Sequence, residues 1–138
     1  MSGEPDCSGG LPMDADPAIR VTMMPKDTNY HGTIFGGVML SYIDQAGAVE
    51  VGKLTRHPLV TVAMKEVIFK EPVFVGDLVS FFCRVERMGT TSVTVRVFVE
   101  AQRRTEALCR VPVTEAVVTY VAVDAERRPT SIVDTPEP

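Results

Sequence analysis

The chain has 138 residues, 45% of them hydrophobic and 23% charged, which is ordinary for one globular domain with a full core. Its formal net charge is −4, from 14 basic and 18 acidic residues, and this argues against general nucleic-acid binding. No apolar run approaches the roughly 20 residues of a membrane span, and no signal-peptide pattern opens the chain, so we expect a cytoplasmic protein without a membrane partner.

The three cysteines are Cys7, Cys83 and Cys109, an odd number without a C-x-x-C pair. This argues against both a disulfide framework and a zinc site. Cys83 and Cys109 lie in strand-like runs, where we expect small core side chains. The sequence therefore predicts no metal.

Residues 1–17 and 125–138 are rich in proline, glycine or polar residues and lack apolar periodicity, so we expect a flexible leader and a flexible tail. One domain, residues 18–124, lies between them. Its first elements are a short strand at residues 18–24 and a loop at residues 25–37.

Residues 38–54 predict one long helix that is apolar on most sides. One arc of this helix carries Leu40, Ile43, Asp44, Gly47, Val51 and Leu54. Because much of the opposite side is also apolar, we expect other structure to wrap the helix. Gly47 would allow a strand or a second subunit to approach closely.

After His57 and Pro58 the apolar pattern changes to period two and predicts four strands. They cover residues 59–69, 78–87, 92–101 and 107–123, separated by turns at 72–77, 88–91 and 102–106. Pro112 requires a sheet edge or a bulge, because proline cannot donate to the ladder. The fold class is therefore α+β, with one antiparallel sheet of about five strands wrapped around a long central helix.

The residues with the clearest chemical meaning are a glycine pair at the helix start, Gly36 and Gly37, and an acid two turns later, Asp44. Glycines there let the backbone approach a ligand and direct unpaired N–H groups at it. Those groups and the helix dipole favour an anion or a polarised carbonyl oxygen. The combination suggests acyl chemistry, with the amides holding a thioester carbonyl and Asp44 acting as general base or nucleophile.

Several motifs in this order resemble the hot-dog-fold acyl-CoA thioesterases, in particular small bacterial acyl-CoA hydrolases and each half of the duplicated cytosolic acyl-CoA hydrolases of animals. The resemblance covers residues 21–123. Its motifs are Met24-Pro-Lys-Asp-Thr-Asn29, Gly32-Thr-Ile-Phe-Gly-Gly37, Asp44-Gln-Ala-Gly47, Val60-Thr-Val-Ala63, Val75-Gly-Asp77, Gly89-Thr-Thr-Ser92 and the run 114–124.

The resemblance implies a hot-dog fold and hydrolysis of acyl-CoA to a free acid and coenzyme A, without a metal or redox cofactor. It implies that Asp44 is the catalytic carboxylate and Asn29 a second functional residue. Relatives form dimers whose sheets join edge to edge, with active sites between subunits, and many assemble into tetramers or hexamers. Asn29 and Asp44 of one site would then come from different chains.

Other residues are candidates for binding the substrate. Thr61 could donate a hydrogen bond to Asp44, and His31 lies in the glycine-rich loop. The stretch Gly89, Thr90, Thr91 and Ser92 offers hydroxyl and N–H groups to a pantetheine or phosphate. Seven basic residues could meet the phosphates of coenzyme A, and the sequence singles out none of them: Lys65, Arg84, Arg87, Arg103, Arg104, Arg127 and Arg128.

Each candidate also has a purely structural interpretation. Asp44 could be a buried acid in an ion pair, Asn29 a turn residue, and the Gly36–Gly37 pair a site of close packing. Residues 89–92 could be an ordinary hairpin. Two other functions remain open: a hot-dog hydratase or dehydratase using His31, and a non-catalytic acyl-CoA-binding module.

Overall fold

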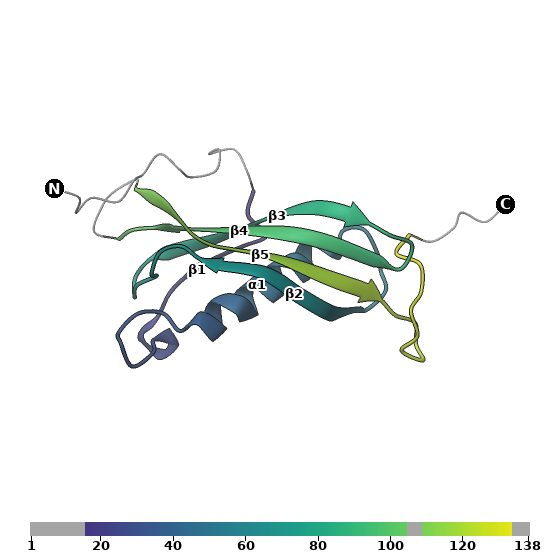
Figure 1. Ribbon diagram of the computed structural model, residues 1–138, viewed down its shortest axis with the longest axis horizontal. Coiled ribbons are helices and arrows are strands. Elements are labelled where there is room, and N and C mark those ends of the chain that lie inside the picture. Colours follow the sequence, from purple (N-terminus) through teal and green to yellow (C-terminus); the bar gives the residue numbers. More distant parts are fainter. Residues whose placement is uncertain (1–15, 105–108, 134–138) are drawn as a thin grey trace.

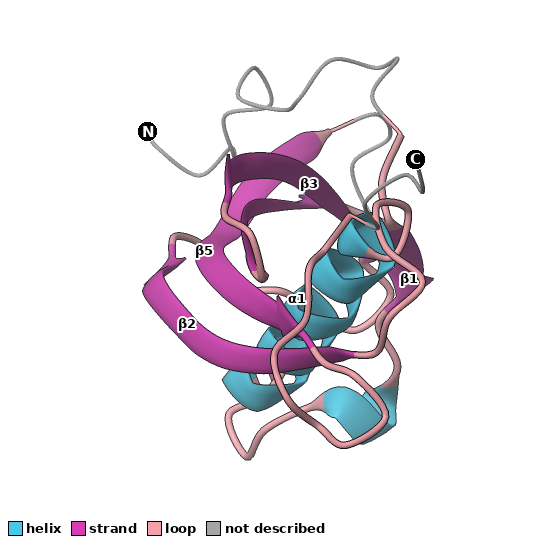
Figure 2. Ribbon diagram, turned by 90° about the vertical axis from the view of Figure 1, so that its right-hand side faces the viewer, coloured by secondary structure: helices cyan, strands magenta, loops and turns pink. Residues whose placement is uncertain are grey.

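A computed structural model describes residues 16–104 and 109–133. The described residues form one antiparallel sheet with strand order β1-β3-β4-β5-β2 and one α-helix. The elements are β1 (Ile19–Thr22), the 3-10 turn η2 (Pro25–Asp27), α1 (Gly36–Val51), β2 (Leu59–Phe69), β3 (Leu78–Met88), β4 (Ser92–Gln102) and β5 (Arg110–Ala122). Figure 1 shows α1 lying along one face of the sheet, and Figure 2 shows the sheet curling around it. The predicted α+β arrangement is confirmed.

The core lies between α1 and the three inner strands, β3, β4 and β5. On β4, Val93, Val95, Val97 and Val99 point to the helix and are at most 2% exposed. Their alternation with polar residues predicted this face correctly, because successive side chains of a strand point to opposite sides.

The helix differs from its prediction in length, and its buried residues match the predicted arc only in part. It runs from Gly36 to Val51, so it begins and ends earlier than the predicted range 38–54. Leu54, predicted on the buried arc, lies beyond the helix end and is 38% exposed. Its buried residues are Met39, Ile43, Ala46, Gly47 and Val51. Val49 is half exposed, so the described part of the chain does not wrap the helix on every side.

The bulge required by Pro112 is present. Val99 of β4 pairs with Thr114 of β5, but the next residue, Glu100, pairs with Pro112, so Val113 is the additional residue on β5. The predicted start of this strand at residue 107 lies outside the described residues. The strand itself ends at Ala122, one residue before the prediction.

Packing continues past the predicted domain boundary at Asp124. The N–H of Ile132 donates to the carbonyl of Thr90 at 2.9 Å, and the Ile132 side chain is 2% exposed. The N–H of Thr130 donates to the carbonyl of Ala122, also at 2.9 Å. Within the described ranges, no helix is long and apolar enough to span a membrane.

The cysteine prediction is correct for one residue and wrong for another. Cys83 is a half-buried free thiol, and burial next to the charge of Glu50 raises its pKa to about 12. Cys109 is buried as expected but is disulfide-bonded, so it is not the isolated core thiol that the sequence predicted. Spacing alone could not show this pairing.

Candidate active site

The loop before the helix is held together by Asn29. Its side-chain oxygen accepts hydrogen bonds from the N–H groups of His31 and Thr33 at 2.8 and 3.2 Å. Its side-chain nitrogen donates to the hydroxyl of Thr33 at 2.9 Å. Asparagine commonly closes turns through such local bonds. In the single chain, Asn29 therefore shapes the loop that leads into the helix.

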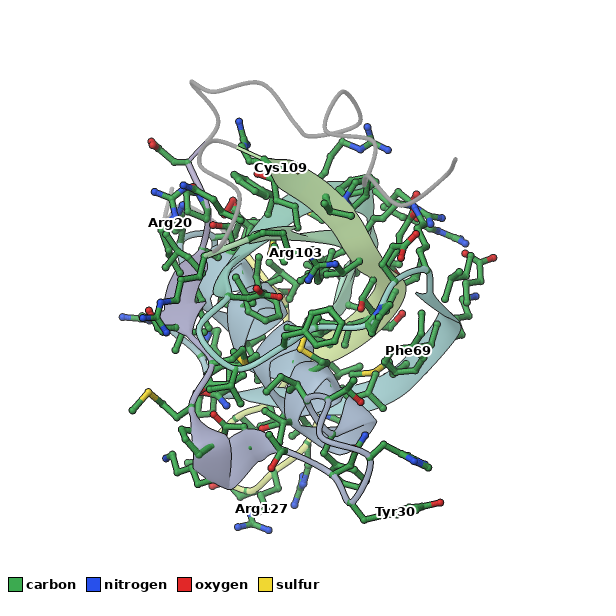
Figure 3. All side chains as sticks on the ribbon, turned by 90° about the vertical axis from the view of Figure 1, so that its left-hand side faces the viewer. Arg20, Tyr30, Phe69, Arg103, Cys109 and Arg127 are labelled. Carbon is green, nitrogen blue, oxygen red and sulfur yellow. The ribbon has the colours of Figure 1, made fainter. Side chains whose placement is uncertain are left out.

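The tip of this loop is exposed. The imidazole of His31 lies against the ring of Tyr30, with centroids 3.8 Å apart. Tyr30 is 92% exposed, and Figure 3 shows it pointing away from the body of the molecule. The loop thus presents an aromatic pair to solvent rather than to the core.

The helix begins with two unpaired amides, as the sequence suggested. The N–H of Val38 donates to the carbonyl of Phe35 at 3.0 Å, whereas the N–H groups of Gly36 and Gly37 have no hydrogen-bond acceptor within residues 16–104 and 109–133. A Cβ atom on Gly37 would lie 2.7 Å from the ring of Phe35. The structural and functional interpretations of this pair are therefore compatible, since close packing and free donors occur together.

Asp44 lies half-buried on α1, facing β2 at the border of the sheet. The hydroxyl of Thr61 donates to its carboxylate oxygen Oδ1 at 2.7 Å, as the sequence suggested. No lysine or arginine of the described residues forms an ion pair with this carboxylate. The alternative of a structural acid paired with a base therefore finds no support in this part of the chain.

The glycine pair and Asp44 lie about two turns apart on the backbone of one helix. Seven residues from Gly37 to Asp44 correspond to about 10 Å along the axis. An attacking atom needs to approach a carbonyl carbon to about 3–3.5 Å, and donors lie about 3 Å from its oxygen. The Asp44 side chain would have to bridge this separation for both groups of one chain to act on one carbonyl.

The stretch Gly89 to Ser92 forms the β3–β4 hairpin. The N–H of Gly89 donates to the carbonyl of Ser92 at 2.8 Å. The carbonyls of Thr90 and Thr91 accept hydrogen bonds from Ile132 and Ala122. These contacts explain the hairpin as part of the fold, and its role in binding coenzyme A stays a prediction.

Two residues have contacts that the sequence did not foresee. The hydroxyl of Tyr120 donates to the main-chain carbonyl of Asp44 at 2.6 Å. The sequence signal for this contact was Gly47, because the absence of a side chain there leaves room for the tyrosine ring. Arg103, one of the seven basic candidates, pairs with the buried carboxylate of Asp77 and donates to the carbonyl of Pro72. Arg103 thus holds a turn. Among the described side chains, no three His, Cys, Asp or Glu residues gather as metal ligands.

Comparison with known proteins gives the same family from sequence and from structure. Residues 31–108 match the thioesterase superfamily. The chain is 38% identical over 119 residues to the acyl-CoA thioester hydrolase YciA of Escherichia coli (strain K12), covering 85% of this chain and 90% of that protein.

Two solved structures are similar over most of their length. A hexameric hotdog fold thioesterase of Campylobacter jejuni is 43% identical, with a TM-score of 0.78 over 85% of this chain and 91% of that one. A hexameric broad specificity acyl-coenzyme A thioesterase is 33% identical, with a TM-score of 0.82 over 92% and 87%. The fold is the hot-dog fold, as predicted, and the chain belongs to the thioesterase superfamily.

Proposed function

We propose that this enzyme hydrolyses acyl-CoA to a carboxylic acid and coenzyme A, and that Asp44 is its catalytic carboxylate. The observation that carries the proposal is the state of Asp44: it lies at an open sheet border, is aimed by the Thr61 hydroxyl and has no basic partner among the described residues. An acid so placed is free to accept a proton or to attack. The acyl-CoA thioester hydrolases and acyl-CoA thioesterases among its relatives support this substrate.

In the general-base route, Asp44 takes a proton from water as the water oxygen bonds to the thioester carbon. The carbon–sulfur bond then breaks, and the coenzyme A thiolate recovers the proton. In the nucleophilic route, an oxygen of Asp44 bonds to the carbon, the thiolate leaves, and water hydrolyses the resulting anhydride. Both routes place negative charge on the carbonyl oxygen, which N–H donors stabilise by about 3 kcal/mol each.

A second chain completes the site in this proposal. The amides of Gly36 and Gly37 of one subunit would hold the carbonyl that Asp44 of the other subunit attacks, because the two positions lie about 10 Å apart along the backbone of one helix. Asn29 would act with the same loop. The hexameric state of two similar thioesterases supports self-association, for which we propose edge-to-edge dimers that assemble further.

The test is a panel of saturated acyl-CoA substrates from short to long chains, with release of coenzyme A measured by a thiol reagent. Asp44→Asn keeps the size of the side chain and removes its basicity, so kcat should fall roughly 10²- to 10⁴-fold. Glu50→Gln is the matched control, since Glu50 lies on the same helix and pairs only with the exposed Lys53 among the described residues.

The control should retain the parent rate, and both variants should keep the parent's circular dichroism and molecular mass. An Asp44→Asn enzyme within threefold of the parent would remove Asp44 from the chemistry. A parent that binds these substrates without releasing coenzyme A would instead favour a binding module or a dehydratase.

A further inference from the structure

A buried tyrosine reaches the helix backbone at the catalytic position. Tyr120 of β5 is 1% exposed, and its hydroxyl donates to the main-chain carbonyl of Asp44 at 2.6 Å. That carbonyl lies inside a helix, where it ordinarily serves only the N–H four residues later. The hydroxyl therefore makes an additional contact at the helical residue that carries the proposed catalytic carboxylate.

Gly47 makes this contact possible. A Cβ atom at this position would lie 2.2 Å from the Tyr120 hydroxyl oxygen and 2.9 Å from two ring carbons. Glycine in the middle of a helix is unfavourable compared with alanine. Gly47 thus lowers the intrinsic stability of the helix but leaves space for the Tyr120 ring to pack against the helix backbone between Asp44 and Ala48.

The same pair of strands also holds the carboxylate. Thr61 of β2 and Tyr120 of β5 are direct cross-strand partners, and Thr61 donates to Oδ1 of Asp44 at 2.7 Å. The register of β2 shifts immediately after Thr61, before Ala63. Such irregularities often redirect a side chain beside an active site. One cross-strand pair therefore contacts Asp44 at both its main chain and its side chain.

We propose that Tyr120 is a positioning residue for catalysis: by fixing the helix backbone at Asp44 while Thr61 fixes the carboxylate, it sets the direction from which the acid meets the thioester. This inference rests on the proposed role of Asp44. Burial, followed by the charge of Asp44, raises the pKa of Tyr120, so its hydroxyl keeps its proton and remains a donor at neutral pH.

The experiment compares Tyr120→Phe with Tyr42→Phe. The first variant removes only the hydroxyl that reaches Asp44. The second is a matched control on α1 itself, because the Tyr42 ring packs on Phe81 with centroids 5.6 Å apart and its hydroxyl has no hydrogen bond within the described residues. Tyr120→Phe should lower kcat roughly three- to tenfold with KM unchanged, and Tyr42→Phe should leave both constants unchanged.

A double variant distinguishes positioning from general damage to the fold. If Tyr120 acts through Asp44, adding Tyr120→Phe to Asp44→Asn should not lower the residual rate further. Equal losses in both backgrounds, or a change in KM alone, would overturn the inference, as would a Tyr120→Phe enzyme with the parent kcat. If Asp44→Asn alone left activity intact, the proposed function would fail first, so the two failures are distinguishable.

Discussion

Gly47 illustrates how one missing side chain shapes this site. The nearest atom to a Cβ at residue 47 is the hydroxyl oxygen of Tyr120, and the ring behind it is equally confined, because Tyr120 is almost completely buried. Neither partner can yield easily in a close-packed interior. The residue type at position 47 is therefore determined by the contact with Tyr120 across the core, and not by helix propensity.

We expect Gly47→Ala to destabilise the protein by about 1–3 kcal/mol, because overpacking outweighs the roughly 1 kcal/mol by which alanine favours a helix. The measurement is urea unfolding followed by circular dichroism at one protein concentration. Gln45→Ala on the exposed side of the same helix is the control and should change the free energy of unfolding by less than about 0.5 kcal/mol. A Gly47→Ala protein as stable as the parent would show that Tyr120 can move aside.

At the scale of the strands, the outer face of the sheet is tied together by an arginine. The guanidinium of Arg96 on β4 forms ion pairs with Glu66 of β2, Glu86 of β3 and Glu115 of β5. Glu115 also pairs with Lys70 at 3.0 Å. This Arg96 cluster spans four of the five strands, so it links them through their side chains.

The cluster predicts a pH dependence of stability. Burial opposes the charge of Glu115, but hydrogen bonds from Lys70 and Arg96 outweigh it, so the pKa of Glu115 lies below its usual value of 4.5. A lowered folded-state pKa stabilises the protein above the unfolded-state pKa, and this contribution is lost as pH falls through the folded-state pKa. The free energy of unfolding should therefore decrease as pH falls from about 5 toward 3.

Glu115→Gln should flatten this decrease, because the variant has no proton to gain at that position. Urea unfolding at several values of pH measures the slope. Glu71→Gln is the matched control: Glu71 is exposed and has no ion pair within the described part of the chain, so its slope should equal that of the parent. Equal slopes for the parent and Glu115→Gln would show that other carboxylates cause the acid sensitivity.

The elements themselves could be predicted from sequence because their signals are local. The alternation of Val93, Val95, Val97 and Val99 identified both the strand and its buried face. The helix was different: it is apolar on most sides, so periodicity alone could not distinguish the buried Met39 from the partly exposed Leu40. A helix that is apolar on most sides has no single buried face marked in its sequence.

The candidate site was predictable only in part for a related reason. Gly36, Gly37 and Asp44 stand out because their residue types are unusual at a helix start and on an apolar helix. The contact between Tyr120 and Asp44, however, depends on strand register, and β2 changes register twice, after Thr61 and after Lys65. A single-residue shift turns every following side chain to the other face. Such contacts become visible only in three dimensions.

At the scale of the whole molecule, β2 is the border strand next to Asp44, and Figure 2 shows it on the opposite side of α1 from β1. Within the described residues, its outer side has no partner strand. Its exposed large hydrophobic residues are Val60, Val62, Ile68 and Phe69, each about half exposed. A long apolar border strand is a template for pairing with another chain. The border that carries Thr61 is therefore also the surface through which the proposed dimer would form.

We expect Val62→Lys to dissociate the assembly and to reduce hydrolysis at least roughly tenfold per chain, because a buried unpaired ammonium strongly disfavours the interface. Light scattering gives the mass and the thiol reagent gives the rate. Val62→Ala keeps the position apolar and should retain both. Val85→Lys is the matched control on the exposed part of β3, where the valine is 37% exposed, and it should stay assembled and active.

The two readouts must change together if the site lies between subunits. In the parent, the rate per chain should fall on dilution at the concentration where the mass falls, since a separated chain keeps Asp44 but lacks the partner's glycine amides. Monomers of Val62→Lys with the parent rate would show that one chain holds a complete site. Intact assemblies of Val62→Lys would show that the chains join elsewhere than at β2.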